Sequence, residues 1–352
     1  MTLAVLYAST GNALDPTEAA RLANDLDAAL HAAGATEVDR LGGGIETTGR
    51  LREIARHAQD NNEAVLLCAD NLVAHPSLLW TLATEPAGRS TALVVADPAG
   101  DLRDDRGRVV SAGDAAGNVR YLGALWLASA DLPLLAKVAD RPDDLLPALL
   151  EAGLVPIATP VRLLHAEQVH TDAELTEARH RVAGIDEDAA RLRLAVKEKD
   201  DFFTTYAVSN WSPIVTKAAA RLGLSPSAVT AVSVLFAVAA ALAFWQASRP
   251  AMIAGAILLY LGFVLDCVDG QVARYTRRFG AFGGWLDTMA DRAKEYAAYA
   301  GLAAGAERIG LPYAWPLAIT AILLQTVRHM TDTWYGALHD EAAARPRPQA
   351  AS

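Results

Sequence analysis

The chain has 352 residues, a length typical of two domains. Its formal net charge of −10 argues against general nucleic-acid binding, which requires a basic face, so we predict no nucleic-acid partner. The two cysteines, Cys68 and Cys267, lie outside any Cys-x2-Cys or Cys/His cluster, and the sequence therefore indicates neither a disulfide framework nor a zinc site.

Residues 1–170 alternate strand-like and helix-like patterns. Apolar runs at Leu3–Tyr7, Ala64–Ala69 and Thr91–Ala96 each end in a turn or a polar pair, and Thr17–Ala33 has helical periodicity. Weaker strand patterns follow at Val109–Val110, Tyr121–Leu127 and Val155–Leu164. Strands interleaved with helices predict a soluble α/β domain whose mainly parallel sheet is covered on both faces. No basic region precedes the first run, so we expect no cleaved signal peptide.

Two segments of different character connect this domain to the rest of the chain. Residues 171–199 are helical in pattern and highly charged, which is typical of a connector. Residues 200–222 mix aromatic residues with Lys217 and Arg221, and this favours a helix lying along a membrane interface. An ordinary amphipathic surface helix is the alternative for that segment.

Residues 223–338 are predicted to form an all-α transmembrane helical bundle. The candidate spans are Ala228–Ala247, Pro250–Leu265, Gly280–Ala306 and Leu311–Val327. The first has no charge over 20 residues, which matches the thickness of the hydrocarbon core. The third is weak by hydropathy because its first half carries several charged residues. Residues 339–352 are polar and rich in proline, and we predict a disordered tail.

The basic residues that flank the spans predict an orientation. Lys197, Lys199, Lys217 and Arg221 precede the first span, Arg274, Arg277 and Arg278 follow the second, and Arg328 follows the fourth. The opposite loops hold only Arg249 and Arg308. By the positive-inside rule both termini are cytoplasmic. We therefore expect a multi-pass protein of the cytoplasmic (inner) membrane, with its N-terminal domain in the cytoplasm.

Four aspartates at helical spacing mark the candidate active site. Asp266 and Asp269 are three residues apart, and Asp287 and Asp291 are four apart, so each pair shares one helix face. An antiparallel hairpin of two spans would bring the four carboxylates together, where a divalent cation would offset their charge. Oxygen ligands favour Mg²⁺ or Mn²⁺. The alternative is a set of carboxylates at a helix mouth that pair with Arg274, Arg278 or Arg292.

The complete pattern, D-x2-D-G-x2-A-R-x8-G-x3-D-x3-D over residues 266–291, resembles the signature of the CDP-alcohol phosphotransferases and matches every fixed position. The resemblance covers roughly residues 200–335. It includes Gly223–Thr230, which is similar to the entry of the family's first span, although Ser227 replaces the usual Asn. The resemblance implies that a CDP-alcohol, typically CDP-diacylglycerol, gives up CMP while an acceptor hydroxyl takes the phosphoryl-alcohol group. It also implies phospholipid biosynthesis and, by analogy, a homodimer.

The resemblance assigns roles to individual residues. It implies that Asp266, Asp269 and Asp287 hold the metal ions, and that Asp291 both helps there and acts as the catalytic base. Nucleotide-binding roles fall to Asp266, Gly270, Ala273, Arg274, Gly283 and Thr230. A phosphate on the acceptor, which would be a polyol or a polyol phosphate such as inositol phosphate or glycerol phosphate, could contact Arg277, Arg278, Arg292 and Lys294. Topological anchoring is the alternative role of these four cations.

Two departures from the family shape the remaining hypotheses. Family members usually have six spans where this sequence shows four, so the chain is shortened, is completed by a second polypeptide, or is inactive. The first 170 residues resemble a sugar-phosphate nucleotidyltransferase, but Leu6–Pro16 has one glycine and no basic residue, and we expect this domain to be catalytically inactive. The alternative to an enzyme is a catalytically inactive membrane scaffold or regulator. A prenyl-diphosphate enzyme is disfavoured because no DDxxD motif occurs.

Overall fold

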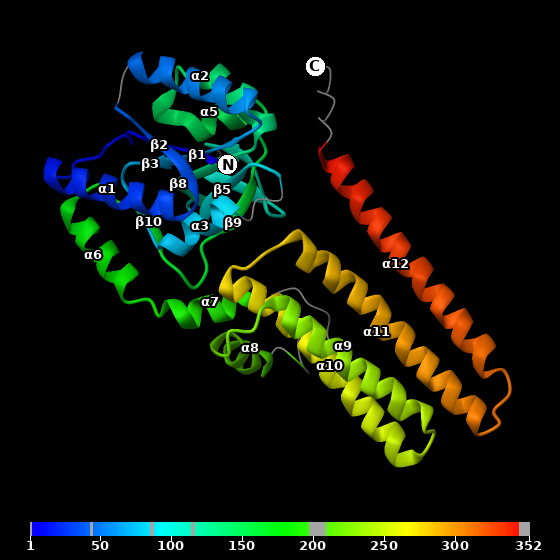
Figure 1. Ribbon diagram of the computed structural model, residues 1–352. Helices are drawn as coiled ribbons and strands as arrows, with labels where there is room; N and C mark the ends of the chain where they lie inside the picture. Colours follow the sequence, from blue (N-terminus) through cyan, green and yellow to red (C-terminus); the bar gives the residue numbers. More distant parts are fainter. Residues whose placement is uncertain are drawn as a thin grey trace. The chain divides into compact units, whose positions relative to one another are not determined.

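The computed structural model describes residues 2–42, 45–84, 88–113, 117–196, 208 and 210–344. The chain forms two compact units, Met1–Ala190 and Arg191–Ser352, and the boundary falls inside helix α7 (Glu187–Ala195) (Figure 1). Each unit has its own buried apolar clusters.

The N-terminal unit is built on an eight-stranded sheet. In spatial order its strands are β2 (Ala35–Leu41), β1 (Thr2–Tyr7), β3 (Ala64–Ala69), β8 (Val119–Leu127), β5 (Thr91–Ala96), β9 (Ile157–Pro160), β7 (Arg108–Ala112) and β6 (Leu102–Asp105). A separate antiparallel pair joins β4 (Leu72–Ala74) to β10 (Ala166–Gln168). All six strand patterns predicted from the sequence correspond to strands.

The prediction of a mainly parallel sheet is wrong. Parallel pairing joins β1 to β2 and β3, and joins β5 to β9, but β8 runs antiparallel to β3, β5 and β6. The β6–β7 and β7–β9 pairings are antiparallel as well. The sheet is mixed because the long β8 strand lies between two strands that run the other way, and apolar periodicity within a strand does not encode the direction of its neighbours.

Helices cover both faces of this sheet, as predicted. Successive residues of β1 alternate between two apolar clusters, with Leu3 and Val5 in one and Ala4 and Leu6 in the other. One cluster is closed by α2 (Ile45–Asp60), α4 (Leu132–Val138) and α5 (Leu145–Glu151). The other is closed by α1 (Pro16–Ala32), α3 (Pro76–Thr84) and α6 (Asp172–Ala183). Short 3-10 turns at Ser129–Asp131 and Pro142–Asp144 precede α4 and α5.

The predicted domain boundary at residue 170 is too early. Helix α6 belongs to the N-terminal unit, because Leu175 and Ala178 are buried in its core. Arg179 adds an ion pair to Glu18 of α1 at 2.7 Å. The charged surface of α6 suggested a connector, but its two buried apolar residues pack it against the core of the N-terminal unit.

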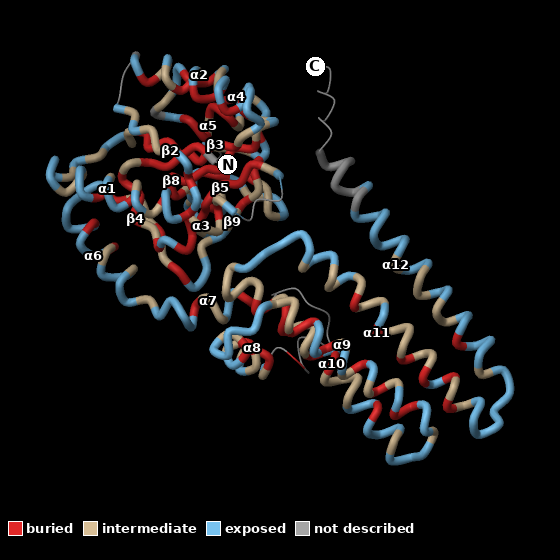
Figure 2. The backbone as a smooth tube through the Cα atoms, in the orientation of Figure 1, coloured by how far each residue is buried: buried red, intermediate tan, exposed pale blue. Residues whose placement is uncertain are grey.

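The C-terminal unit consists of long helices: α8 (Ser212–Arg221), α9 (Pro226–Trp245), α10 (Arg249–Thr276), α11 (Ala281–Arg308) and α12 (Ala314–Ala344). Helix α9 packs against both α10 and α11, and α12 packs against α11. Ser225 and Ser248 cap α9 and α10, each accepting a backbone N–H with its side chain, and Arg277 ends α10 in the left-handed conformation. Buried residues are dense in the N-terminal sheet, whereas α9 to α12 expose much of their surface (Figure 2).

Two of the four predicted spans are long and apolar enough to cross a membrane. They are α9 and α10, each with a mean hydropathy of 2.2. Helix α11 is as long as α10 and α12 is longer, but within the described residues neither qualifies as a candidate span, because charged and polar residues lower their hydropathy. Four spans therefore remain a proposal.

Glycines let α9 approach its neighbours closely. A Cβ atom added at Gly301 of α11 would lie 2.5 Å from the carbonyl oxygen of Ala241 on α9, and one added at Gly305 would overlap the carbonyl oxygen of Phe244. The two glycines are four residues apart and form a Gly-x3-Gly motif. Backbone-to-backbone contact through this motif holds α11 against α9.

The remaining predicted segments are partly visible. Most of residues 200–209 lies outside the described residues, but α8 is helical and packs on α10, where the buried Gln271 bonds Thr216 at 2.8 Å and Ser212 at 2.9 Å. The disordered tail predicted from residue 339 is wrong at its start, because α12 continues to Ala344. Alanines favour the helix there, and it ends before a proline-rich sequence.

Candidate active site

The four aspartates lie on α10 and α11, and α9 holds these two helices together. Carboxylate oxygens of Asp266, Asp269 and Asp287 all lie within 4.8 Å of one another. Two helices thus bring three of the four predicted ligands to one point, as their spacing predicts. Among the described residues, Asp291 is not part of this group.

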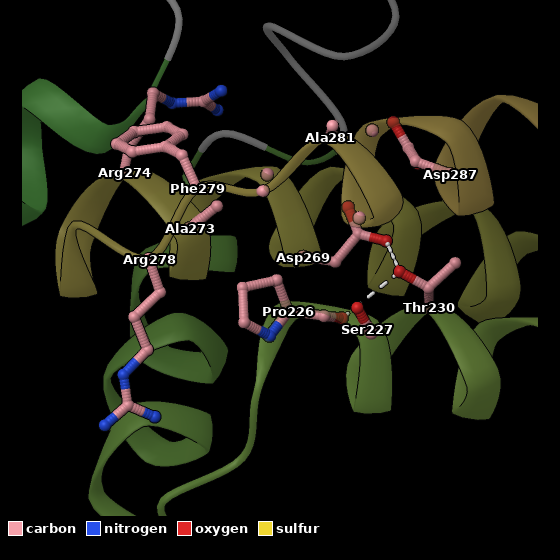
Figure 3. A pocket seen from close by; sticks show the side chains of 14 residues that line it. Pro226, Ser227, Thr230, Asp269, Ala273, Arg274, Arg278, Phe279, Ala281 and Asp287 are labelled. Atoms are coloured by element: carbon pink, nitrogen blue, oxygen red, sulfur yellow. Dashed lines mark hydrogen bonds between the residues drawn. The ribbon is translucent and has the colours of Figure 1, made fainter. Parts of the chain in front are cut away.

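Asp269 is the most buried of the three carboxylates. It is only 4% exposed, and Thr230 of α9 donates a hydrogen bond of 2.5 Å to its Oδ2 (Figure 3). Thr230 therefore orients a carboxylate from the neighbouring helix. A cluster of three carboxylates from two helices, one of them fixed by a buried hydroxyl, fits a hard divalent cation such as Mg²⁺ or Mn²⁺.

Asp291 is instead paired with a lysine. Its Oδ1 lies 3.0 Å from Nζ of Lys294, and the same Nζ donates a hydrogen bond to Asp266. Lys294 is buried, and its Nζ also contacts the hydroxyl of Ser233 on α9 at 3.3 Å. The sequence offered Lys294 as an acceptor-phosphate ligand, whereas the structure gives it two aspartate partners.

A cavity of about 470 Å³ opens on one side of the aspartates (Figure 3). Its lining includes the predicted nucleotide-binding residues Thr230, Gly270, Ala273, Arg274 and Gly283, together with Asp269 and Asp287. Pro226 and Ser227 at the start of α9 and Phe279 before α11 also line it. Five of the six predicted nucleotide residues thus surround one cavity; the sixth, Asp266, lines a different one.

That second cavity, of about 630 Å³, is lined by residues of α9, α10, α11 and α12. Asp266, Asp291 and Lys294 line it. Its lining also includes Glu295, which contacts Gln325 at 2.8 Å and His329 at 2.7 Å across to α12. Sequence reasoning missed these residues, because only the packing of α12 brings them to the site.

The four cations predicted to contact an acceptor phosphate do not lie in one cavity. Arg278 lines the first cavity and Lys294 the second, while Arg277 and Arg292 line neither of these two. The second cavity has a further cation, Arg328 of α12. The guanidinium of Arg274 is also used structurally, because its Nε donates to the carbonyl oxygen of Ala195 at 2.6 Å.

In the N-terminal unit, several polar side chains at and after β1, β3 and β8 contact one another or are buried. Asp70, after β3, accepts hydrogen bonds from the Ser9 backbone N–H at 3.0 Å and the Ser9 hydroxyl at 2.8 Å. Burial raises the pKa of the Tyr7 and Tyr121 hydroxyls well above its usual range, and raises the pKa of the Cys68 thiol to about 12. The two tyrosine hydroxyls and the Cys68 thiol therefore stay protonated in the folded unit.

Comparison with known proteins bears on the C-terminal unit. The model of the family described as CDP-alcohol phosphatidyltransferase matches residues 224–343. The archaetidylinositol phosphate synthase of Pyrococcus horikoshii is 34% identical over 91 residues, which are 26% of this chain and 47% of that protein. The phosphatidylinositol phosphate synthase of Streptomyces avermitilis is 34% identical over 101 residues, which are 28% of this chain and 41% of that protein. The chain therefore matches less than half of the length of these curated relatives.

The N-terminal unit is similar to nucleotidyltransferases of known structure. The inositol-1-phosphate CTP transferase of T. maritima aligns with a TM-score of 0.37 and 12% identity, over 52% of this chain and 96% of that one. A likeness this distant carries no functional argument. The sequence match is of another kind, because it includes all four aspartates of the Asp266–Asp291 pattern: residues 224–343 form a domain of the CDP-alcohol phosphatidyltransferase family.

Proposed function

We propose that the C-terminal unit is a divalent-metal-dependent transferase that moves a phosphoryl-alcohol group from a CDP-alcohol to an acceptor hydroxyl and releases CMP. The observation that carries this proposal is the meeting of three carboxylates, of which Asp269 and Asp287 line one cavity and Asp266 lines another. The family match over residues 224–343 supports the same chemistry.

The three clustered aspartates are the proposed ligands of Mg²⁺ or Mn²⁺. A bound cation supplies neutralisation of the charge on a diphosphate. Asp269 and Asp287 border the first cavity, so the diphosphate of the donor would lie there. The small residues Gly270, Ala273 and Gly283 leave its wall open to the close approach of a nucleotide, and Arg274 adds positive charge.

Asp291 borders the second cavity, which we assign to the acceptor. The acceptor hydroxyl gives its proton to Asp291 while its oxygen forms a bond to the lipid-bearing phosphorus. The bond from that phosphorus to the CMP oxygen breaks, and CMP leaves with the electron pair. Arg328 lies in the same cavity and is suited to a phosphate on the acceptor.

The names of the relatives suggest substrates. Both produce inositol phosphate lipids by name, so inositol phosphate is the first acceptor to test and glycerol phosphate the second. The donor we propose is CDP-diacylglycerol. This assignment places the protein in phospholipid biosynthesis.

A bilayer is the proposed environment of the C-terminal unit. Helices α9 and α10 qualify as spans, and large apolar side chains are exposed along the bundle, including Leu235, Ile253 and Leu324 at 63–67% exposure. We propose that α11 and α12 also cross the membrane, with the aspartates at the cytoplasmic side and the N-terminal unit in the cytoplasm. A homodimer stays a prediction by analogy.

The decisive experiment follows CMP release. Membranes that contain the full chain are incubated with CDP-diacylglycerol, Mg²⁺ and either inositol phosphate or glycerol phosphate. Asp291→Asn should lower the rate by about 100-fold or more, because it removes the base. Glu307→Gln, which removes a carboxylate at the far end of the same helix, should not. Normal turnover by Asp291→Asn refutes the base assignment, and a wild-type chain that releases no CMP with either acceptor favours the inactive scaffold.

A further inference from the structure

Lys294 places a positive charge beside the clustered carboxylates of Asp266, Asp269 and Asp287, which are called the metal group below. Its side chain is 9% exposed, and its Nζ contacts Asp266, Asp291 and Ser233. Asp266 therefore has two neighbours: Asp269 and the rest of the three-carboxylate group on one side, and the ammonium group on the other. Asp269 and Asp287 belong to the metal group, Asp291 contacts the lysine, and Asp266 belongs to the metal group and contacts the lysine as well.

The contacts around Lys294 fix its ammonium group in place. Ser233 donates its own hydrogen to the carbonyl oxygen of Gly262 at 2.8 Å, which leaves a lone pair of its oxygen directed at Nζ. Asp266 and Asp291 supply two negative charges. A buried ammonium group with these partners has its desolvation compensated, so it is a built feature of the site.

We infer that Lys294 takes the place of a second divalent cation between Asp266 and Asp291, so that the substrate-free protein binds one divalent ion, at Asp266, Asp269 and Asp287. A second ion bound to Asp266 and Asp291 would have to displace Nζ or lie within a few ångströms of it. Two like charges at such a distance repel strongly in a partly buried site. This inference rests on the proposed function.

Counting bound Mn²⁺ tests the inference without measuring activity. The full chain is purified in detergent and titrated with Mn²⁺, and free Mn²⁺ is followed by its electron paramagnetic resonance signal. The wild-type chain should bind one ion, and Asp269→Asn should lose it. Lys294→Met should bind a second ion or hold Mn²⁺ at least about tenfold more tightly, because the competing charge is gone.

Three further variants make the result specific. Lys294→Arg keeps the charge and should still bind one ion. Lys217→Met removes a lysine charge from α8, outside the metal group, and should bind as the wild type does. Asp291→Asn should keep its single ion, because Asp291 contacts the lysine and not the metal group; this variant tests the inference even if Lys294→Met does not fold.

The outcomes separate the two proposals. A wild-type chain that binds two ions, a folded Lys294→Met that binds one ion with unchanged affinity, or loss of the ion in Asp291→Asn would each overturn the role of Lys294. CMP release by the wild-type chain in those cases leaves the proposed function standing. A wild-type chain that neither binds Mn²⁺ nor releases CMP would overturn the proposed function itself.

Discussion

Replacing Gly301 by alanine should separate α9 from α11. The new Cβ would lie 2.5 Å from the carbonyl oxygen of Ala241 and 2.7 Å from its Cα, and both atoms are backbone. An ordinary contact needs about 3.5 Å, so the two helices must move apart by about 1 Å at this level. Overpacking of this kind costs about 1–3 kcal/mol.

The matched control is Gly336→Ala on α12, where an added Cβ meets nothing within 4 Å. Both substitutions bring the same gain in helix propensity, about 1 kcal/mol, so their difference isolates the clash. In thermal unfolding followed by circular dichroism, Gly301→Ala should melt about 3–10 °C below Gly336→Ala. Equal melting temperatures would show that α9 and α11 are not in backbone contact. A second substitution at Gly305 should cost less than the first, since the helices have already separated.

Two further predictions concern a hydroxyl of the active site and the interior of the N-terminal unit. Thr230→Val removes the donor to Asp269 at nearly constant volume and should weaken Mn²⁺ binding about 10- to 100-fold in the same titration; unchanged affinity would contradict the orienting role. The pKa values of Tyr7, Tyr121 and Cys68 are raised by burial, so the neutral forms stabilise the fold fully below about pH 9 and this stabilisation is lost as the pH rises further. Alkaline titration of the tyrosine absorbance should show that two of the nine tyrosines ionise only when the unit unfolds, and smooth titration of all nine in the folded protein would refute this.

The metal group could be predicted because its information is local. Asp266 and Asp269 share one helix face, as do Asp287 and Asp291, and the short connection between the helices limits how far apart the pairs can be. The spacing did not predict that Asp291 would pair with Lys294 instead of joining the other three aspartates. Lys294 is three residues from Asp291 on the same helix but 28 residues from Asp266, and only the packing of α10 and α11 on α9 brings it to Asp266 as well.

Other features were not predicted because they too depend on contacts between segments that are distant in the sequence. The apolar runs of β1, β3 and β5 located strands correctly, but the direction of β8 depends on its pairing with β3, β5 and β6, which are separate segments of the chain. The second cavity requires α12, which adds Arg328 and His329 to its lining and makes two hydrogen bonds to Glu295. The Gly-x3-Gly motif at Gly301 was readable in the sequence and would have indicated a close helix contact there.

The hydrogen bond from Arg274 to Ala195 determines which N-terminal truncations leave the C-terminal unit intact. Ala195 is the last residue of α7, and Arg191 of the same helix bonds the carbonyl oxygen of Tyr275 at 2.6 Å. The end of α7 is therefore held against the end of α10, beside the first cavity. A shortened chain that starts at residue 200 would strip Arg274 of this support, whereas one that starts before Glu187 would retain it.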